Sequence, residues 1–376
     1  MMRGFLPAIC ALLLCALLVA GLWPLDPTPP NEVNRSANQN GLEFGHNATI
    51  YSPNVFNIAV SEEDPFCTLE IWLQPAFGYV KDSVTILAFY TSDDPLQFVL
   101  KQRADELLVQ RDYRDRQDHL QTGEIKIEHA FQRNEQAVFA ITSSPKGTAV
   151  YENGAFQESS SRFGLSCKSF SGQLIIGNSP ISYNTWQGRL LGLAIFHQAR
   201  SKEQASRHFG VWIRTPDPVS LQNDRPLALY SFGQGSSRTI HDRTGSSPDL
   251  YIPETFKILH KKLLTPPWEE FSLDRSYAWD VLVNVGGFIP FGVLFYAFFT
   301  SDRKWNRAAA ATIVLGGLTS LTIEVLQMFI PSRTSGITDI ITNTLGTILG
   351  VILCRWRPVQ EAIGKLQESV GTPSSG

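Results

Sequence analysis

The chain has 376 residues, of which 43% are hydrophobic and 18% are charged. This length predicts at least two domains, and the apolar content excludes a disordered chain. With 32 Lys and Arg residues against 35 Asp and Glu residues, the formal charge of −3 gives no electrostatic support for a nucleic acid partner.

The hydrophobic residues concentrate in four nearly charge-free stretches. Each approaches the ~20 residues that an α-helix needs to cross ~30 Å of hydrocarbon. Three of them lie close together near the C-terminus, which argues against the alternative of buried helices in a soluble protein. We therefore predict a membrane protein with about four spanning helices, at residues 5–23, 280–299, 308–330 and 337–354.

Charges beside these stretches predict their orientation. Arg3 precedes the first stretch, and the segments 302–307 and 355–365 beside the others are net basic. Because basic loops stay in the cytoplasm, we expect both termini there and the long segment 24–278 outside. The alternative for the first stretch is a cleaved signal peptide, which leaves the other three orientations unchanged.

Two of the five cysteines, Cys67 and Cys167, lie in the segment that we expect outside the cytoplasm. An oxidising compartment favours a disulfide between them. Closing so long a loop stabilises the fold by ~4–5 kcal/mol on the chain-entropy model. The alternative is a pair of buried thiols.

After a linker at 24–43 that is rich in Pro, Asn and Ser, the pattern changes to short strands. Turn signals such as Asn153-Gly154 and Asp93-Asp94-Pro95 separate them. Many short strands at close spacing predict an all-β sandwich or jelly roll. The expected strands lie at 69–73, 83–90, 96–100, 124–128, 137–142, 147–152, 173–176 and 189–196.

Several ordered pieces of this region resemble the concanavalin A-like, laminin-G-like jelly roll. They are CTLEIWLQPA at 67–76, AVFAITSSPKGTAVYENGAF at 137–156, GQLIIGNSP at 172–180 and WQGRLLGLAIFHQARSKEQASRHF at 186–209. The resemblance covers roughly 40–212 and implies a hairpin turn at Asn153-Gly154 and a short helix at about 202–209. Residues 227–253 look like the opening strand and turn of such a domain. We expect them to close the same sandwich in permuted order; the alternative is an extra hairpin packed outside.

Many proteins that share this fold bind carbohydrate, some of them with calcium. On that resemblance, Tyr183 and Trp186 are candidates to stack on sugar rings, and Asp93 and Asp94 are candidates to ligate calcium. The alternatives are a core position for Trp186 and a solvated turn for the two aspartates. We identify no pair of carboxylates suited to glycoside hydrolysis, so we predict binding over hydrolysis.

Polar side chains within membrane spans are costly. Here they form three pairs, each on one helix face: Asp280 with Asn284, Glu324 with Gln327, and Asp339 with Asn343. At 1.5 Å per residue, all three pairs lie within roughly 10 Å of the outward helix ends. We predict one polar site, with Glu324, Arg333 and Asp339 as catalytic candidates; the alternative is structural hydrogen bonding between helices. Gly316-Gly317 and the pair Gly346 and Gly350 indicate close helix packing. The polar residues are Asp280, Asn284, Glu324, Gln327, Arg333, Asp339 and Asn343.

The same residues resemble the VanZ-like membrane proteins. NVGGFIPFG at 284–292 and EVLQMFIPSRTSGITDIITNTLG at 324–346 match that family's pattern in order and spacing. The resemblance covers about 265–357, with the first stretch serving as the family's first helix. The chain departs from the pattern in its large inserted sandwich and in residues 334–338, which separate Arg333 from Asp339. The family is bacterial and linked to envelope phenotypes that include teicoplanin resistance, which implies the inner membrane and a sandwich in the periplasm or outside the cell.

We therefore expect six segments: a membrane helix at 1–23, a linker at 24–43, a β-sandwich at 44–255, a connector at 256–277, VanZ-like helices at 278–357 and a cytoplasmic tail at 358–376. The expected function is binding of an envelope glycan or polymer by the sandwich, with a polar site in the membrane. The expected partners are the lipid bilayer and an envelope glycan or lipid-linked saccharide, with a role in glycopeptide tolerance or polysaccharide export. The alternative is a membrane enzyme acting on a lipid-linked glycan or polyprenyl phosphate; a small transporter ranks below both.

Overall fold

The structure is a computed structural model that describes residues 2–35, 40–58, 65–94, 97–114, 120–214, 218–233, 237–273, 275–300 and 305–356. It divides into two compact units. We call Met1–Pro27 with Lys262–Gly376 the bundle, and Thr28–Lys261 the sandwich. The basic residues Arg303, Lys304, Arg357 and Lys365 and the predicted tail at 358–376 lie outside the described residues.

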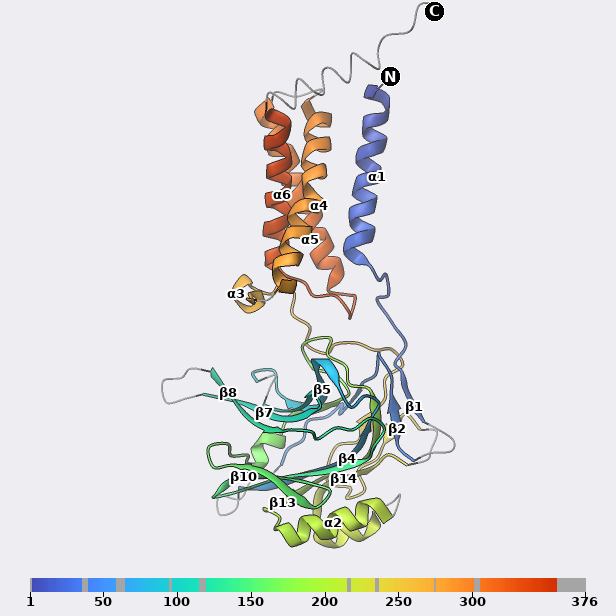
Figure 1. Cartoon of the computed structure of the whole chain (residues 1–376). Helices are drawn as coiled ribbons and strands as arrows, with labels where there is room; N and C mark the ends of the chain where they lie inside the picture. Colours follow the sequence, from blue (N-terminus) through green and yellow to red (C-terminus); the bar gives the residue numbers. More distant parts are fainter. Residues whose placement is uncertain are drawn as a thin grey trace, which may run out of the picture. The chain divides into compact units, whose positions relative to one another are not determined.

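The bundle consists of helices (Figure 1). They are α1 (Met2–Leu22), the short α3 (Pro267–Glu270), α4 (Arg275–Thr300), α5 (Trp305–Gln327) and α6 (Ile337–Arg355). Within the described residues, four of them are long and apolar enough to cross a membrane. Leu12, Val314 and Phe329 leave 60% or more of their surface exposed, as expected of side chains that face lipid. The predicted set of four membrane helices is confirmed.

Helices α4 and α6 approach each other through glycines. A Cβ atom at Gly346 or Gly350 of α6 would overlap the backbone carbonyl oxygen of Val285 or Ile289 of α4. Gly292 of α4 meets the α6 backbone in the same way. Small residues let membrane helices pack backbone to backbone, so the predicted packing role of the α6 glycine pair is confirmed.

The sandwich has two antiparallel sheets, each of eight strands within the described residues. The first sheet has the order β1-β2-β13-β4-β9-β10-β11, with β14 beside β13, and the second has the order β15-β16-β3-β12-β5-β6-β7-β8. The predicted β-sandwich class is confirmed. The strands of the first sheet are β1 (Val33–Arg35), β2 (Leu42–Phe44), β4 (Cys67–Pro75), β9 (Ala137–Ser144), β10 (Gly147–Glu152), β11 (Ala155–Ser160), β13 (Gly188–His197) and β14 (Pro226–Ser231). Those of the second are β3 (Ile50–Tyr51), β5 (Val80–Tyr90), β6 (Phe98–Ala104), β7 (Glu106–Arg114), β8 (Leu120–Ile127), β12 (Gln173–Ile176), β15 (Thr239–Ile240) and β16 (Leu250–Tyr251).

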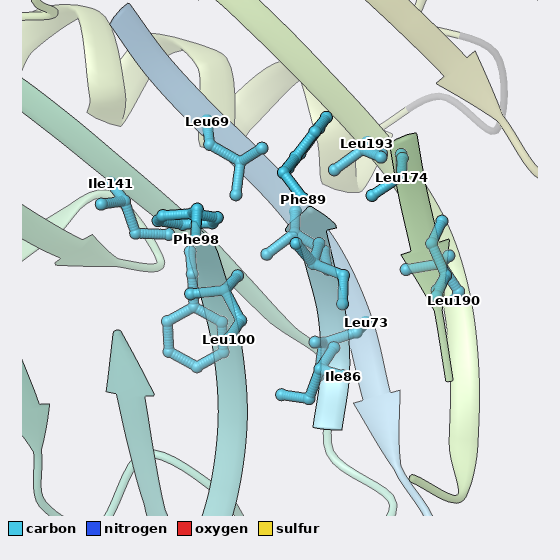
Figure 2. Packing of buried hydrophobic residues seen from close by; sticks show 14 of the residues in the cluster. Leu69, Leu73, Ile86, Phe89, Phe98, Leu100, Ile141, Leu174, Leu190 and Leu193 are labelled. Atoms are coloured by element: carbon cyan, nitrogen blue, oxygen red, sulfur yellow. The ribbon is translucent and has the colours of Figure 1, made fainter. Parts of the chain in front are cut away.

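The main core lies between the two sheets. Side chains alternate along each strand, so Leu69 and Leu73 of β4 point toward Phe89 of β5 and Phe98 of β6 (Figure 2). Phe89 and Phe98 are fully buried, with ring centroids 6.4 Å apart. Burial of each such side chain stabilises the fold by ~1.5–3 kcal/mol. A second cluster lies under helix α2 (Lys202–Arg214), which covers the outer face of the first sheet.

The late segment 227–253 contributes strands to both sheets. β14 pairs with β13, and β16 pairs with β3. These pairings make the segment part of the sandwich and exclude an extra hairpin packed outside. The turn Asn153-Gly154 has positive φ at both residues, 50° and 77°, and joins β10 to β11 as the family resemblance implies.

Cys67, at the start of β4, forms a disulfide with Cys167. The bond links residues 100 positions apart in the sequence, so the predicted disulfide is confirmed. On the chain-entropy model, closing such a loop stabilises the sandwich by ~4–5 kcal/mol.

Candidate functional site

A cavity of about 830 Å³ opens within the bundle, where α1 and α5 end and α4 and α6 begin. We call it the polar cavity. Helices α3, α4, α5 and α6 and the loop that joins α5 to α6 each contribute polar side chains to its lining. These side chains include every polar residue that the sequence placed in the membrane site: Asp280, Asn284, Glu324, Gln327, Arg333, Asp339 and Asn343.

Glu324 lies near the end of α5, with 1% of its surface exposed. Its Oε2 accepts a hydrogen bond of 2.7 Å from the backbone N–H of Gly336, which is the residue that precedes α6. A carboxylate is favoured at this position because the first N–H groups of a helix have no partner within the helix and carry partial positive charge.

Two side-chain hydrogen bonds join α6 to its neighbours. Asn284 of α4 donates through Nδ2 to Oδ1 of Asp339, at 2.8 Å. Asn343 of α6 donates through Nδ2 to Oγ of Ser320 of α5, at 2.9 Å. Interhelical hydrogen bonds of this kind contribute ~1 kcal/mol each in membranes, so these amides have a structural role whatever else the cavity does.

Gln327 and Asp280 also line the polar cavity. Gln327 is 2% exposed and donates through Nε2 to the backbone oxygen of Gly21 on α1, at 2.7 Å. Asp280 lies in the second turn of α4 and is exposed. The contact with α1 shows that the first helix closes one side of the cavity.

Arg333 is the cationic side chain of the cavity lining. It lies within electrostatic range of Glu324 and Asp339. Among the described residues, it forms no ion pair, and its buried Nε has no hydrogen-bond partner. A guanidinium held in this way is suited to receive an anionic group in two parallel hydrogen bonds.

A further carboxylate, Glu270 of α3, was not predicted from the sequence. Its Oε2 accepts a hydrogen bond of 3.2 Å from the backbone N–H of Thr338, in the first turn of α6. The preceding chain is held in place by a bridge between Thr265 and Gly336. The signal in the sequence is PPWEEF at 266–271, which places two acidic residues just before a membrane span.

The cavity thus presents carboxylates, amides and one guanidinium. Within the described part of the chain, no group of three or more His, Cys, Asp or Glu side chains is arranged to hold a metal ion. The lining offers hydrogen-bond donors and acceptors for a polar headgroup, and its carboxylates are chemically able to act as acid or base.

Residues 227–358 match the sequence model of the VanZ/LLP1 family. The match covers about a third of the chain, and the resemblance to VanZ-like proteins is confirmed for this part. We call it the VanZ region. It includes α4, α5, α6 and the polar cavity residues that they carry. No protein with a curated description matches the chain.

Several solved structures are similar in fold to the sandwich, which precedes most of the VanZ region. A protein from Bacteroides ovatus whose proposed role is carbohydrate binding aligns over 56% of this chain at 14% identity, with a TM-score of 0.37. A heptameric SAP-like pentraxin from Limulus polyphemus aligns over 48% at 15% identity, with a TM-score of 0.32. The receptor-binding domain of botulinum neurotoxin D aligns over 50% at 15% identity, with a TM-score of 0.33. The chain spans 61%, 78% and 47% of their lengths, and scores this low assign no ligand to the sandwich.

Of the two aromatic residues predicted to stack on sugar, Trp186 is buried in the sandwich and Tyr183 is partly exposed. Trp186 is fully buried, and its Nε1 donates to Oε1 of Gln102 at 3.2 Å. The expectation of an exposed Trp186 ring is therefore wrong, because the core takes this side chain. Tyr183 donates to Oδ1 of Asn47 at 2.8 Å, and its ring contacts that of Phe256. Burial raises the pKa of Tyr183.

Asp93 and Asp94 lie in the turn after β5, with Asp93 exposed and Asp94 partly buried. The backbone N–H of Asp94 donates to Oγ1 of Thr91, and Oδ1 of Asp93 accepts from Ser92. No third acidic or His side chain among the described residues joins them in a metal-binding group. Calcium at this turn stays a prediction.

The sandwich buries one acidic cluster that sequence patterns did not reveal. Glu70 of β4 is fully buried and accepts hydrogen bonds from Trp212 Nε1, at 2.8 Å, and from His208, whose Nδ1 lies 2.7 Å away. His208 Nε2 lies 3.2 Å from Asp224. These contacts fix α2 to the first sheet, which is a structural role.

Proposed function

We propose that the protein is a bacterial envelope protein whose bundle binds the polar headgroup of a lipid or lipid-linked saccharide at the outer leaflet. The sandwich, in this proposal, binds an envelope glycan outside the membrane. The observation that carries the proposal is the polar cavity itself. Ionisable side chains within membrane spans are costly and mark functional sites by default, and here they surround a space large enough for a ligand.

The depth of the cavity supports its assignment to the outer leaflet. The first turns of α4 and the last turns of α5 line it, so the end of α4 at Thr300 and the start of α5 at Trp305 lie away from the cavity. In the sequence, the residues between these two helix ends and the first turn of α5 include Arg303, Lys304 and Arg307. Because basic loops stay in the cytoplasm, the cavity end of the helices faces outward.

A second candidate function is catalysis on the same ligand. Glu324 and Asp339 line one cavity and lie within electrostatic range of each other. Two carboxylates in such an arrangement are able to divide the roles of proton donor and acceptor. In this version, Arg333 binds the anionic group of a polyprenyl phosphate or lipid-linked glycan while the acids transfer protons.

The test of the proposed function is single substitution in a bacterial host that carries the gene. Glu324→Gln, Arg333→Gln and Asp339→Asn change the chemistry with little change in size. We expect each to reduce glycopeptide tolerance while the protein level in the membrane stays normal. Thr322→Val is the matched control, since Thr322 is exposed and donates within its own helix to Leu318.

The outcomes separate the site from a purely structural role. A normal phenotype at normal protein level for all three variants would contradict the proposal. If every variant with reduced glycopeptide tolerance is also lost from the membrane, the residues have a structural role in hydrogen bonding instead. The role of the sandwich is tested separately by glycan-array binding of residues 28–261, and an absence of binding would leave the cavity as the sole binding site of the proposal.

A further inference from the structure

We propose that the headgroup held in the polar cavity is zwitterionic, with a primary ammonium group and a phosphate group a few bonds apart. The inference rests on the proposed function and names the chemistry of its ligand. Two sources share this chemistry: a phosphoethanolamine lipid of the bilayer, and a soluble amine phosphate such as phosphoethanolamine or an amino-sugar phosphate.

The balance of charge in the lining argues against a purely anionic ligand. Five acidic side chains and the guanidinium of Arg333 line the cavity. Glu269 is paired with Lys262 at 2.6 Å. The other four form no ion pair with any Lys, Arg or His among the described residues; they are Glu270, Asp280, Glu324 and Asp339. A phosphate alone would add a negative group to a lining that has more acidic than basic side chains, which is unfavourable.

The phosphate end of the ligand is assigned to Arg333. Its Nε is buried and unpartnered among the described residues, and the guanidinium forms no ion pair there. The planar guanidinium matches the oxygens of a phosphate in two parallel hydrogen bonds. A phosphate beside Arg333 satisfies the buried Nε–H that the protein itself leaves without an acceptor.

The ammonium end is assigned to unpartnered oxygens in the first two turns of α6. Asn343 is 5% exposed and lines the cavity, and its Oδ1 has no hydrogen-bond partner among the described residues. Thr338, which is 9% exposed, likewise has an unpartnered Oγ1 there. A buried acceptor without a donor is costly, and a primary ammonium brings three donors and no acceptor. Asp339, one residue beyond Thr338, supplies the opposite charge.

We assign the positive charge to the ligand and not to a bridging divalent cation. Within the described residues, the carboxylates of the lining do not form a group of three able to hold a metal. The distinction is open to experiment, because a metal bridge makes binding of a phosphate lipid depend on the free cation and an ammonium does not.

The test uses the purified full-length chain, stripped of lipid in detergent and titrated with lipids of identical acyl chains under native mass spectrometry. The probes are phosphatidylethanolamine, phosphatidylcholine and phosphatidylglycerol. We expect phosphatidylethanolamine to bind about tenfold more tightly than either of the others, since a trimethylated ammonium cannot donate hydrogen bonds and a glycerol headgroup carries no positive charge. Binding should not change with EDTA.

Substitutions assign each end of the ligand to its residues. Asp339→Asn should reduce binding of phosphatidylethanolamine and leave that of phosphatidylglycerol unchanged, so that the preference is lost. Arg333→Gln should weaken both lipids, and Thr322→Val neither. Competition by soluble phosphoethanolamine at comparable concentration would identify a soluble source of the same chemistry, and its failure to compete would identify the lipid.

Failure of the inference differs from failure of the proposed function. Phosphatidylglycerol that binds as tightly as phosphatidylethanolamine would overturn the zwitterionic headgroup and leave a headgroup site in place. Loss of binding in EDTA with recovery on added Mg²⁺ would replace the ammonium by a metal bridge and overturn the inference too. If no lipid binds the wild type more tightly than it binds an Arg333→Gln, Asp339→Asn double variant, both proposals are wrong.

Discussion

The carboxylate of Glu270 occupies the space that a side chain at Gly336 would fill. A Cβ atom on residue 336 would overlap Oε1 of Glu270, while Oε2 accepts the N–H of Thr338 in the first turn of α6. The N–H of Gly336 donates to Glu324 in turn. The start of α6 is therefore held between carboxylates from α3 and α5, and this arrangement sets one wall of the polar cavity.

Gly336→Ala should displace Glu270 and loosen the start of α6. Gly336 has extended backbone angles, φ −135° and ψ 147°, so alanine adopts them without strain and the effect comes from the overlap alone. The Glu270 carboxylate is the end of a flexible side chain, so the main cost is its lost hydrogen bond to Thr338. We expect a loss of ~1 kcal/mol in stability, measured by thermal unfolding of the detergent-solubilised chain. Gly286→Ala is the control, since nothing lies within 4 Å of a Cβ there. Equal melting temperatures for the two variants would show that the contact with Glu270 is unimportant.

The glycine contact between α4 and α6 makes a separate prediction. Gly350→Ala should push the helices apart, because its Cβ would overlap the backbone oxygen of Ile289 and the Cα of Gly292. We expect a loss of ~1–3 kcal/mol, read as a lower melting temperature in the same assay. The same Gly286→Ala control applies, and a Gly350→Ala variant that melts with the wild type would contradict the close approach.

The buried cluster around Glu70 should dominate the stability of the sandwich. Glu70→Ala leaves the Nε1–H of Trp212 and the ring of His208 without their buried acceptor. Removal of one partner of such a buried cluster costs ~3–5 kcal/mol, measured by urea unfolding followed by tryptophan fluorescence. Glu158→Ala on the exposed face of β11 should change stability little. A small effect at Glu70 would mean that water replaces the carboxylate.

Tyr90 predicts how sandwich stability depends on alkaline pH. Burial and the nearby Tyr51 raise the pKa of Tyr90 from 10.0 to about 12. Above pH 10 the unfolded chain releases this proton while the folded chain keeps it, so stability falls as pH rises from 10 toward 12. Its hydroxyl has no partner among the described residues, so Tyr90→Phe should leave stability at pH 7 nearly unchanged.

The same variant tests the sign of that dependence. Tyr90→Phe should reduce the alkaline loss of stability by ~2 kcal/mol, in urea unfolding at pH 9 and pH 12. Burial also raises the pKa of Tyr230, so this residue accounts for part of the pH dependence of stability that remains in the variant. An identical slope in wild type and variant would show that Tyr90 titrates as an exposed tyrosine does.

Sequence patterns predicted the membrane helices well because each depends on a long apolar run. Most of the longer sandwich strands were also predicted, since alternation marks those with one buried face. The short strands β1, β2, β3, β15 and β16 were not predicted individually, and β1 lies in the segment predicted as a linker. Among the longer strands, β7 and β11 were missed. β11 is almost entirely exposed, so it takes its place from pairing with β10 and not from an apolar pattern. β7 carries Leu107, Leu108 and Val109, three consecutive buried residues that show no alternation.

The candidate site was predictable only in part, again for physical reasons. Helical spacing placed Glu324 on one helix face with Gln327, and Asp339 on one face of another helix with Asn343. The structure brings both carboxylates to one cavity. Glu270 lies outside any membrane span, so no spacing rule points to it. Trp186 was a false candidate for a different reason. A large aromatic side chain suits a hydrophobic core as well as a sugar-binding surface, and the sequence does not show that this side chain is buried in the folded sandwich.

The most direct test of the central claim compares the lipids that co-purify with the protein. The full chain and a Glu324→Gln, Asp339→Asn double variant are purified from the same membranes under the same conditions, and their bound lipids are identified by mass spectrometry. The account predicts that the wild type is enriched in one headgroup class relative to the membrane and that the variant, at equal yield and melting temperature, loses this enrichment. Identical lipid profiles for the two proteins would contradict the claim that the polar cavity is a headgroup site.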